Sequence, residues 1–156
     1  MKTRKSWREK IDGAPERKVE TLSAKDAVRL KARTLLIPHP TDVEAVARTV
    51  KKGKLLTTDQ IRKHLAQKFG AETTCPLCTG IFMRLISEAA EEAIAEGKTK
   101  ITPYWRVLKS DGSLNEKYPG GFAAHKEKLI AEGHKISGTL KKPRVENYEQ
   151  KLMELE

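Results

Sequence analysis

The chain has 156 residues, of which 38% are hydrophobic and 33% are charged, and these proportions are typical of one soluble globular domain rather than two. Its longest apolar run, TLLIP, is far too short to cross a bilayer, and no apolar stretch follows the basic N-terminus as it would in a signal peptide, so we expect a cytoplasmic protein. The net charge of +10 favours a polyanionic partner, with nucleic acid first and an anionic membrane surface second.

Residues 1–34 are rich in lysine and arginine, and only the stretch SAKDAVRLKA has a helical pattern. Ser23 can cap a helix there, but the apolar face that includes Ala27 and Leu30 is thin. Because such a face offers little burial, we expect a basic arm or short helix that contacts backbone phosphates of DNA without reading its sequence.

Three helices are predicted next. Thr41 precedes Glu44 by three residues in TDVEAVARTVKKGK, and Thr57 precedes Gln60 by three in TTDQIRKHLAQKFG, which is the spacing of a capping box. The third helix, CPLCTGIFMRLISEAAEEAIAEG, has Pro76 near its first turn. Only about four residues separate the last two helices, which is typical of a helix-turn-helix whose second helix enters the major groove.

The stretch KTKITPYWRVLKSDGSLN is predicted to be extended, with SDG as the turn of a β-hairpin. A helix-turn-helix followed by a hairpin predicts a mainly α, winged helix-turn-helix fold with a small β-hairpin wing. A further helix, AAHKEKLIAEG, ends at Gly133. We therefore expect a basic N-terminal arm at 1–34, a DNA-binding domain at 35–137, and a charged, possibly helical tail at 138–156.

Cys75 and Cys78 form the motif CPLC and are the only cysteines. A CxxC motif suits a redox pair or half of a zinc site, but a zinc site needs two more ligands and the four histidines are scattered without ligand spacing. No α/β sheet that would hold a thioredoxin-like motif is readable. We expect two half-buried packing residues at the start of a helix, with no metal and no cofactor.

Several strings resemble the DNA-binding domain of the methylated-DNA–protein-cysteine methyltransferases and their alkyltransferase-like relatives. That family's reactive stretch reads Pro-Cys-His-Arg-Val, and Pro103, Arg106 and Val107 match it, whereas Tyr104 stands at the reactive cysteine and Trp105 at the histidine. Further matches in order and spacing are SDGSL (110–114), YPGGF (118–122) and AEGHKI (131–136). The resemblance covers roughly residues 35–137.

The departures from the family pattern argue against alkyl transfer. In the family a cysteine thiolate, activated through water by the histidine and a glutamate, takes the alkyl group from a flipped guanine. Of these three groups only Glu132 is retained. A tyrosine phenol has a pKa near 10 and is protonated at neutral pH, and a tryptophan cannot relay a proton.

The alkyltransferase-like proteins are similar in this respect, because a bulky residue replaces their cysteine and they bind alkylated DNA without repairing it. The resemblance implies a monomer that binds double-stranded DNA, holds a flipped alkylguanine, and marks it for a repair partner. Tyr104 would close the floor of the base pocket, Tyr118 and the two glycines would form its rim, and Leu77 would replace the arginine that enters the base stack. The residues expected at the DNA and the base pocket are Thr58, Leu77, Thr79, Arg84, Tyr104, Trp105, Arg106, Tyr118, Gly120 and Gly121, with Glu132 as the residual member of the family triad.

Plainer interpretations stand beside these. Tyr104 and Trp105 can be core residues that anchor the hairpin, and Glu132 is expected to be solvated or to hold a backbone amide. For Arg106 a structural hydrogen bond to a loop carbonyl is the first choice. Two other functions remain open: a winged-helix transcriptional regulator that binds a specific DNA site, and an enzyme that uses Cys75 or Cys78.

Overall fold

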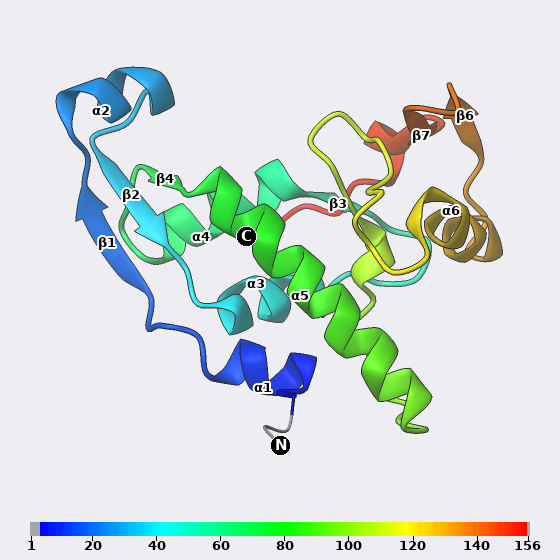
Figure 1. The fold of residues 1–156 in the computed structure, drawn as a ribbon. Helices are drawn as coiled ribbons and strands as arrows, with labels where there is room; N and C mark the ends of the chain where they lie inside the picture. Colours follow the sequence, from blue (N-terminus) through cyan, green and yellow to red (C-terminus); the bar gives the residue numbers. More distant parts are fainter. Residues whose placement is uncertain (1–3, 156) are drawn as a thin grey trace.

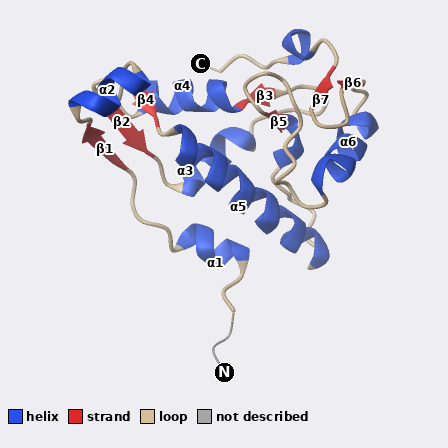
Figure 2. Ribbon diagram, turned by 45° about the horizontal axis from the view of Figure 1, so that its top comes forward, coloured by secondary structure: helices blue, strands red, loops and turns tan. Residues whose placement is uncertain are grey.

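The computed structural model describes residues 4–155 and has a mixed α/β fold (Figures 1 and 2). The α-helices are α1 (Trp7–Asp12), α2 (Ala24–Leu30), α3 (Pro40–Ala47), α4 (Thr58–Lys68), α5 (Pro76–Ala95) and α6 (Gly121–Ala131). The strands are β1 (Lys18–Thr21), β2 (Thr34–Ile37), β3 (Leu56–Thr57), β4 (Thr73–Thr74), β5 (Val107–Leu108), β6 (Ile136–Gly138) and β7 (Pro143–Val145). Short 3-10 helices span Tyr104–Arg106 and Tyr148–Lys151.

The two helices predicted as a helix-turn-helix are present as α4 and α5. The Thr57 amide donates to Gln60 Oε1 at 3.0 Å, and the Gln60 amide donates to Thr57 Oγ1 at 3.4 Å, so the predicted capping box is confirmed. Arg62 fixes the turn, because its Nε donates to the Thr74 carbonyl at 3.0 Å while the Thr74 hydroxyl donates to the Arg62 carbonyl at 2.7 Å. Helix α5 crosses the centre of the molecule (Figure 1).

Helix α3 begins before the predicted capping residues. Its N-cap is His39: the His39 amide donates to Asp42 Oδ2 at 2.9 Å, and the Thr41 amide donates to His39 Nδ1 at 3.2 Å. Pro40 occupies the first helical position, where its missing N–H leaves no bond unmade. Glu44 does not complete a capping box, because it is buried and bound to other partners.

The N-terminal segment is folded: the short helix predicted with Ser23 as its cap is present as α2, and the residues before it form α1 and β1 and not a loose arm. Strand β1 pairs antiparallel with β2, and β2 pairs in parallel with β4 to form a three-stranded sheet. Helix α1 lies against α3 and α5, where Ile11 is fully buried. The Arg8 guanidinium donates to both Glu44 oxygens at 2.8 and 2.7 Å. The overlooked signal is the apolar pair Trp7 and Ile11, four residues apart on one helical face.

The predicted hairpin wing is wrong, although its turn is present. The Gly112 amide donates to the Lys109 carbonyl at 2.9 Å, and the Lys109 amide donates to the Ser113 carbonyl at 3.1 Å. The 3-10 helix at Tyr104–Arg106 leaves room for only the two-residue strand β5, which pairs in parallel with β3. The antiparallel hairpin is β6–β7, which begins at the end of the predicted DNA-binding domain and continues into the segment predicted to be a charged tail.

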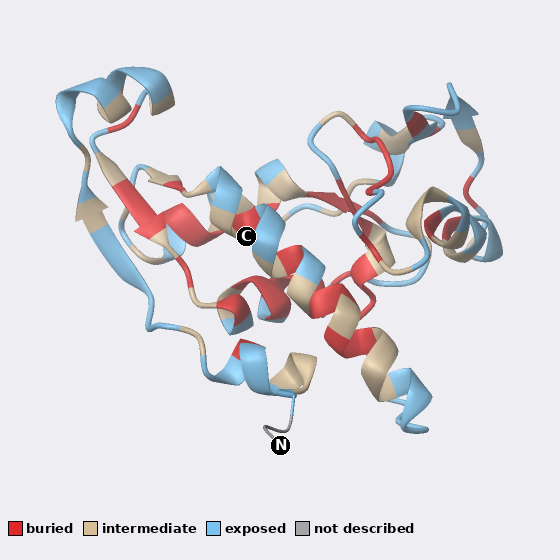
Figure 3. Cartoon of the chain, in the orientation of Figure 1, coloured by how far each residue is buried: buried red, intermediate tan, exposed pale blue. Residues whose placement is uncertain are grey.

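Two hydrophobic clusters hold these elements together (Figure 3). The larger one includes residues of α1, α3, α4 and α5 together with Tyr104 and Tyr118. The smaller one comprises Leu55, Leu108, Leu114, Leu129 and Val145, and it ties the 109–117 loop and the β6–β7 hairpin to α6. Between residues 4 and 155, no helix is both long enough and apolar enough to span a bilayer.

Candidate functional site

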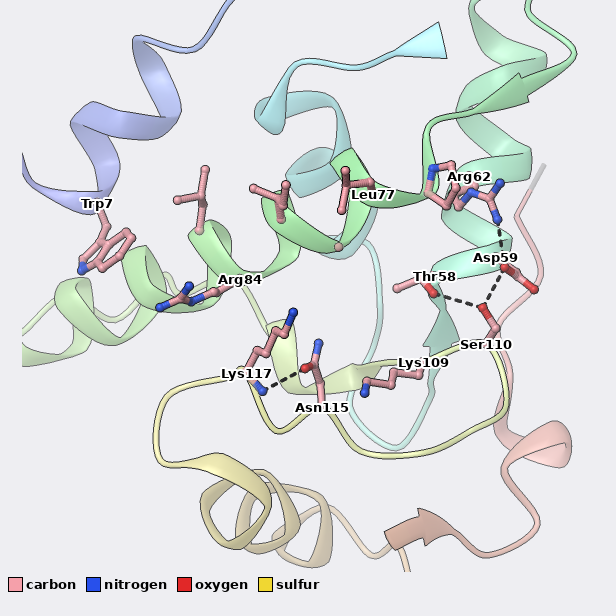
Figure 4. Close-up of a pocket in the computed structure, with 14 residues that line it drawn as sticks. Trp7, Thr58, Asp59, Arg62, Leu77, Arg84, Lys109, Ser110, Asn115 and Lys117 are labelled. Carbon is pink, nitrogen blue, oxygen red and sulfur yellow. Dashed lines mark hydrogen bonds and ion pairs between the residues drawn. The ribbon is translucent and has the colours of Figure 1, made fainter. Parts of the chain in front are cut away.

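A groove of about 390 Å³ lies between the N-terminal half of α5 and the 109–117 loop, and we call it the α5 groove (Figure 4). Helix α5 contributes its apolar side, the start of α4 closes one end, and Trp7 of α1 lies at the other. The groove is lined by Trp7, Thr58, Asp59, Arg62, Pro76, Leu77, Gly80, Ile81, Arg84, Leu85, Lys109, Ser110, Asn115 and Lys117.

The α5 side of the groove exposes large apolar side chains. Leu77 is 73% exposed and Ile81 is 50% exposed, and both lie on α5, the longest helix of the described chain. Gly80 lies between them, and a Cβ built on it would meet no heavy atom within 4 Å. Glycine inside a helix costs about 0.5–1 kcal/mol relative to alanine, and packing does not account for that cost here. Exposed apolar side chains around an unfilled glycine are typical of a binding surface.

The groove also carries positive charge, from the 109–117 loop opposite α5 and from Arg84 on α5 itself. Arg84, Lys109 and Lys117 are exposed and make no ion pair with any residue between 4 and 155, and we call these three the groove cations. The one carboxylate in the lining, Asp59, is compensated by Arg62 at 3.3 Å. The groove therefore combines an apolar surface with an excess of positive charge, which suits a ligand that carries both bases and phosphates.

The 109–117 loop is held firmly at both ends. Near α4, the Ser110 hydroxyl donates to Asp59 Oδ1 at 2.7 Å and lies 3.3 Å from the Thr58 hydroxyl. Near α6, the Asn115 amide donates to His125 Nδ1 at 3.1 Å, and Asn115 Oδ1 accepts from the Lys117 amide at 3.0 Å. The groove wall is thus preorganised rather than loose.

His125 is a structural residue under this loop. Burial lowers the pKa of His125 to about 4, despite its hydrogen bond to the Trp105 carbonyl. Its ring is therefore neutral at pH 7, and because Nδ1 accepts from the Asn115 amide, Nε2 carries the proton and donates to the Trp105 carbonyl at 2.8 Å. The ring joins the groove wall to the buried segment that contains Tyr104 and Trp105.

The structure brings only part of the predicted site to the groove. Thr58, Leu77 and Arg84 line it, and Figure 4 shows them with the 109–117 loop. Thr79 is fully buried, and its hydroxyl donates to the Cys75 carbonyl at 2.8 Å. Gly120 and Gly121 lie at the start of α6 with φ angles of 83° and 66°, which favour glycine.

Tyr104 lies in the core and does not line the groove. Its side chain is 1% exposed, and its hydroxyl donates to Glu91 Oε2 at 3.0 Å. The ring centroid lies 5.3 Å from that of Trp105 and 5.1 Å from that of Tyr118, with edge-to-face geometry in both pairs. Burial and the Glu91 carboxylate raise the pKa of Tyr104, and burial also raises the pKa of Tyr118. The Tyr118 hydroxyl donates to the Val107 carbonyl at 2.9 Å, so this aromatic cluster is tied to strand β5.

Arg106 and Glu132 form a part-buried ion pair. Arg106 Nη2 lies 2.6 Å from Glu132 Oε2, and Arg106 Nη1 donates to the Val50 carbonyl at 2.7 Å, so the predicted hydrogen bond to a loop carbonyl is present. The expectation that Glu132 is solvated or holds a backbone amide is wrong, since its side chain is only 9% exposed and bound to Arg106. Burial alone would raise the pKa of Glu132, but the guanidinium outweighs it and holds that pKa below its usual range.

The cysteine pair lies at the start of α5. Cys75 is the N-cap, and its Sγ accepts from the Cys78 amide at 3.2 Å. Both side chains are half-buried and unbridged. Burial and the hydrogen bond with Cys75 raise the pKa of Cys78 to about 12, so this thiol stays protonated at neutral pH.

Several groove residues were not anticipated from the sequence. Lys109, Asn115 and Lys117 lie within or beside the family-like strings, in which the glycines are the more conspicuous residues. Trp7 lies in the segment predicted to be a basic arm. The Trp7 and Ile11 pair in an otherwise charged stretch is the signal that this segment packs on the domain.

Comparison with known proteins gives a match in structure only. No family model matches the chain, and no curated protein does either. Two solved structures match it: S. pombe Atl1 in complex with damaged DNA containing O6-carboxymethylguanine, and S. pombe ATL in complex with DNA. Each match has 20% identity and a TM-score of 0.53, and covers 74% of this chain and 94% of the other.

The chain has the Atl1 fold. This confirms, at the level of the fold, the resemblance to the alkyltransferase-like proteins read from the sequence strings. At 20% identity the match carries no assignment of individual residues, so the roles of the groove residues depend on the geometry described above.

Proposed function

We propose that this protein binds double-stranded DNA in the α5 groove and recognises an alkylated or flipped guanine without removing the alkyl group. The observation that carries the proposal is the exposed Leu77–Gly80–Ile81 surface of α5 together with the groove cations, of which two stand on the rigid 109–117 loop. The Atl1 fold supports it, because the solved relative was crystallised with DNA that contains O6-carboxymethylguanine.

Within this proposal the cationic and the apolar residues of the groove have different roles. The groove cations hold phosphates on either side of the target base, which gives affinity but no selectivity. Leu77, at the start of α5, is the apolar wedge that parts the base step when the guanine leaves the stack. The backbone at Gly80 allows close approach of the nucleic acid, because no side chain occupies that part of the groove.

The chemistry of the site supports binding without alkyl transfer. The residue at the family's reactive position is a buried tyrosine whose hydroxyl already donates to Glu91 and whose pKa is raised. Glu132 is committed to Arg106, and the Cys78 thiol is protonated at pH 7. The consequence for the cell is that a bound lesion is marked for a separate repair protein.

A paired assay tests the proposal. Dissociation constants are measured for matched duplexes that differ only in one guanine, plain or O6-methylated, and the methylated duplex is also prepared with a radiolabelled methyl group. We expect tighter binding of the methylated duplex and no label on the protein. Label on the protein would identify an alkyltransferase. Equal binding of the two duplexes would remove lesion recognition and favour a winged-helix regulator.

A further inference from the structure

Trp7 is the only aromatic side chain that lines the α5 groove within residues 4–155. It is half-buried and lies at the end of the groove beside Arg84, as Figure 4 shows. Its position is fixed through the backbone: the amides of Trp7 and Arg8 donate to the two oxygens of Glu92 on α5 at 3.1 and 3.4 Å. The indole is thus presented by a docked helix and not by a loose segment.

A second depression, of about 490 Å³, lies on the other side of Trp7. It is bordered by Arg4, Lys5 and Lys10, none of which makes an ion pair within the part of the chain that the structure describes. The Lys10 ammonium lies 4.1 Å from the centroid of the indole ring. Of the two carboxylates there, Glu92 is occupied by the two backbone amides and Glu9 accepts from the Ser6 hydroxyl at 3.2 Å.

We propose that α1 is a second nucleic-acid contact, in which Trp7 stacks on an unpaired nucleobase while the basic side chains on both sides of it hold the flanking phosphates. This inference rests on the proposed function, since it takes DNA as the ligand of the groove. An indole between two cationic depressions matches a strand in which a base lies between two phosphates. When a base stacks on the indole, the Lys10 ammonium can leave the face of the ring and bind a phosphate instead.

The test uses two duplexes, one fully paired and one with a single unpaired guanine, and the full-length chain. Trp7→Ala is expected to weaken binding of the unpaired-guanine duplex by about tenfold, the effect of losing one base–aromatic stack, and to weaken binding of the paired duplex less. Trp7→Phe is expected to restore most of the affinity. Leu140→Ala, at a 98% exposed apolar side chain outside the groove lining, is the matched control and is expected to bind as the parent does.

Tryptophan emission gives a second readout that does not depend on the stability of the alanine variant. The chain has two tryptophans, and Trp105 packs against both core clusters and lies outside the groove lining. The unpaired-guanine duplex is expected to quench the parent's emission and to leave that of Trp7→Phe unchanged. Quenching that persists in Trp7→Phe, or an equal loss of affinity for both duplexes in Trp7→Ala, would overturn the inference.

The same variants separate this inference from the proposed function. The ratio of affinities for methylated and plain duplexes is measured in parallel. If the parent protein does not prefer the methylated duplex, and Trp7→Ala weakens binding of the unpaired-guanine duplex selectively, then the lesion-sensing proposal fails and the stacking role of Trp7 stands. If the parent prefers the methylated duplex, and both Trp7 variants bind every duplex as the parent does, then the lesion-sensing proposal stands and the stacking role of Trp7 fails.

Discussion

Gly80→Ala is expected to make the protein more stable and to bind DNA less well. Gly80 lies inside α5, its φ is not positive, and an added Cβ would meet no heavy atom within 4 Å. The methyl group therefore has no steric cost, and the higher helix propensity of alanine gives about 0.8–1 kcal/mol. For a domain of this size, that free energy raises the melting temperature by about 2–4 °C. Thermal unfolding followed by far-ultraviolet circular dichroism measures it.

The same methyl group stands in the α5 groove and keeps a ligand backbone from approaching the helix. We expect affinity for duplex DNA to fall by about tenfold, or about 1.4 kcal/mol. Gly70→Ala is the matched control: it also has open space around its Cβ, but its φ of 72° strains any other residue, so it should lose stability and keep its DNA affinity. A stabilised Gly80→Ala protein that binds DNA as the parent does would refute the view that this glycine is kept for a ligand.

The groove cations, the part-buried ion pair and the buried aromatic each give a further prediction. Replacing the groove cations by glutamine should make DNA binding less sensitive to salt: the slope of the logarithm of the binding constant against the logarithm of salt concentration should become shallower by about 0.9 for each phosphate that is no longer bound. The control Lys25→Gln, on α2, should leave that slope unchanged. Arg106→Met should cost about 1.5–3 kcal/mol in urea unfolding, because it leaves the part-buried Glu132 carboxylate without its hydrogen-bond partner. The pKa of Glu132 is lower in the folded protein than in the unfolded one, so its stabilisation is present above about pH 4.3 and is lost as the pH falls through the folded value. Without the Arg106 guanidinium, burial raises this pKa, so Arg106→Met should reverse the dependence and lose stability as the pH rises. Tyr104→Phe should lose about 1 kcal/mol, the hydrogen bond to Glu91, and should keep the preference for methylated DNA; a changed preference would place Tyr104 in the base pocket.

The sequence predicted the helix-turn-helix because its signals are local. The Thr57–Gln60 capping box and the SDG turn each need only neighbouring residues. The sheets could not be predicted in this way. Strands β3, β4 and β5 have two residues each, too few for a periodic pattern, and they form only because distant segments meet. The exposed, charged strand β1 resembles a loop until β2 supplies its partner.

Only part of the groove could be predicted from the sequence, because the rest of it also depends on contacts between distant segments. Family-like strings marked the 109–117 loop, but they also pointed to residues that the tertiary fold buries, such as Tyr118. Whether a side chain points into a core or a groove depends on elements far away in sequence, and here helix α1 is the element that mattered. It contributes Trp7 to the groove and Arg8 to the buried Glu44.

If the α5 groove binds DNA as we propose, the positions of the aromatic residues explain how it can hold a base without acting on it. The Tyr104 ring is buried and packs edge-to-face against Trp105 and Tyr118, so it is a core residue and not part of the groove surface. The base-stacking surface is then free to lie elsewhere, on α1 at the end of the groove. Because Trp7 is held by Glu92 of α5, the helix that lines the groove also sets the distance between the stacking ring and the Leu77 wedge. Binding and chemistry are thereby separated in space, and substitutions in α1 should alter the affinity for unpaired bases without creating any alkyl-transfer activity.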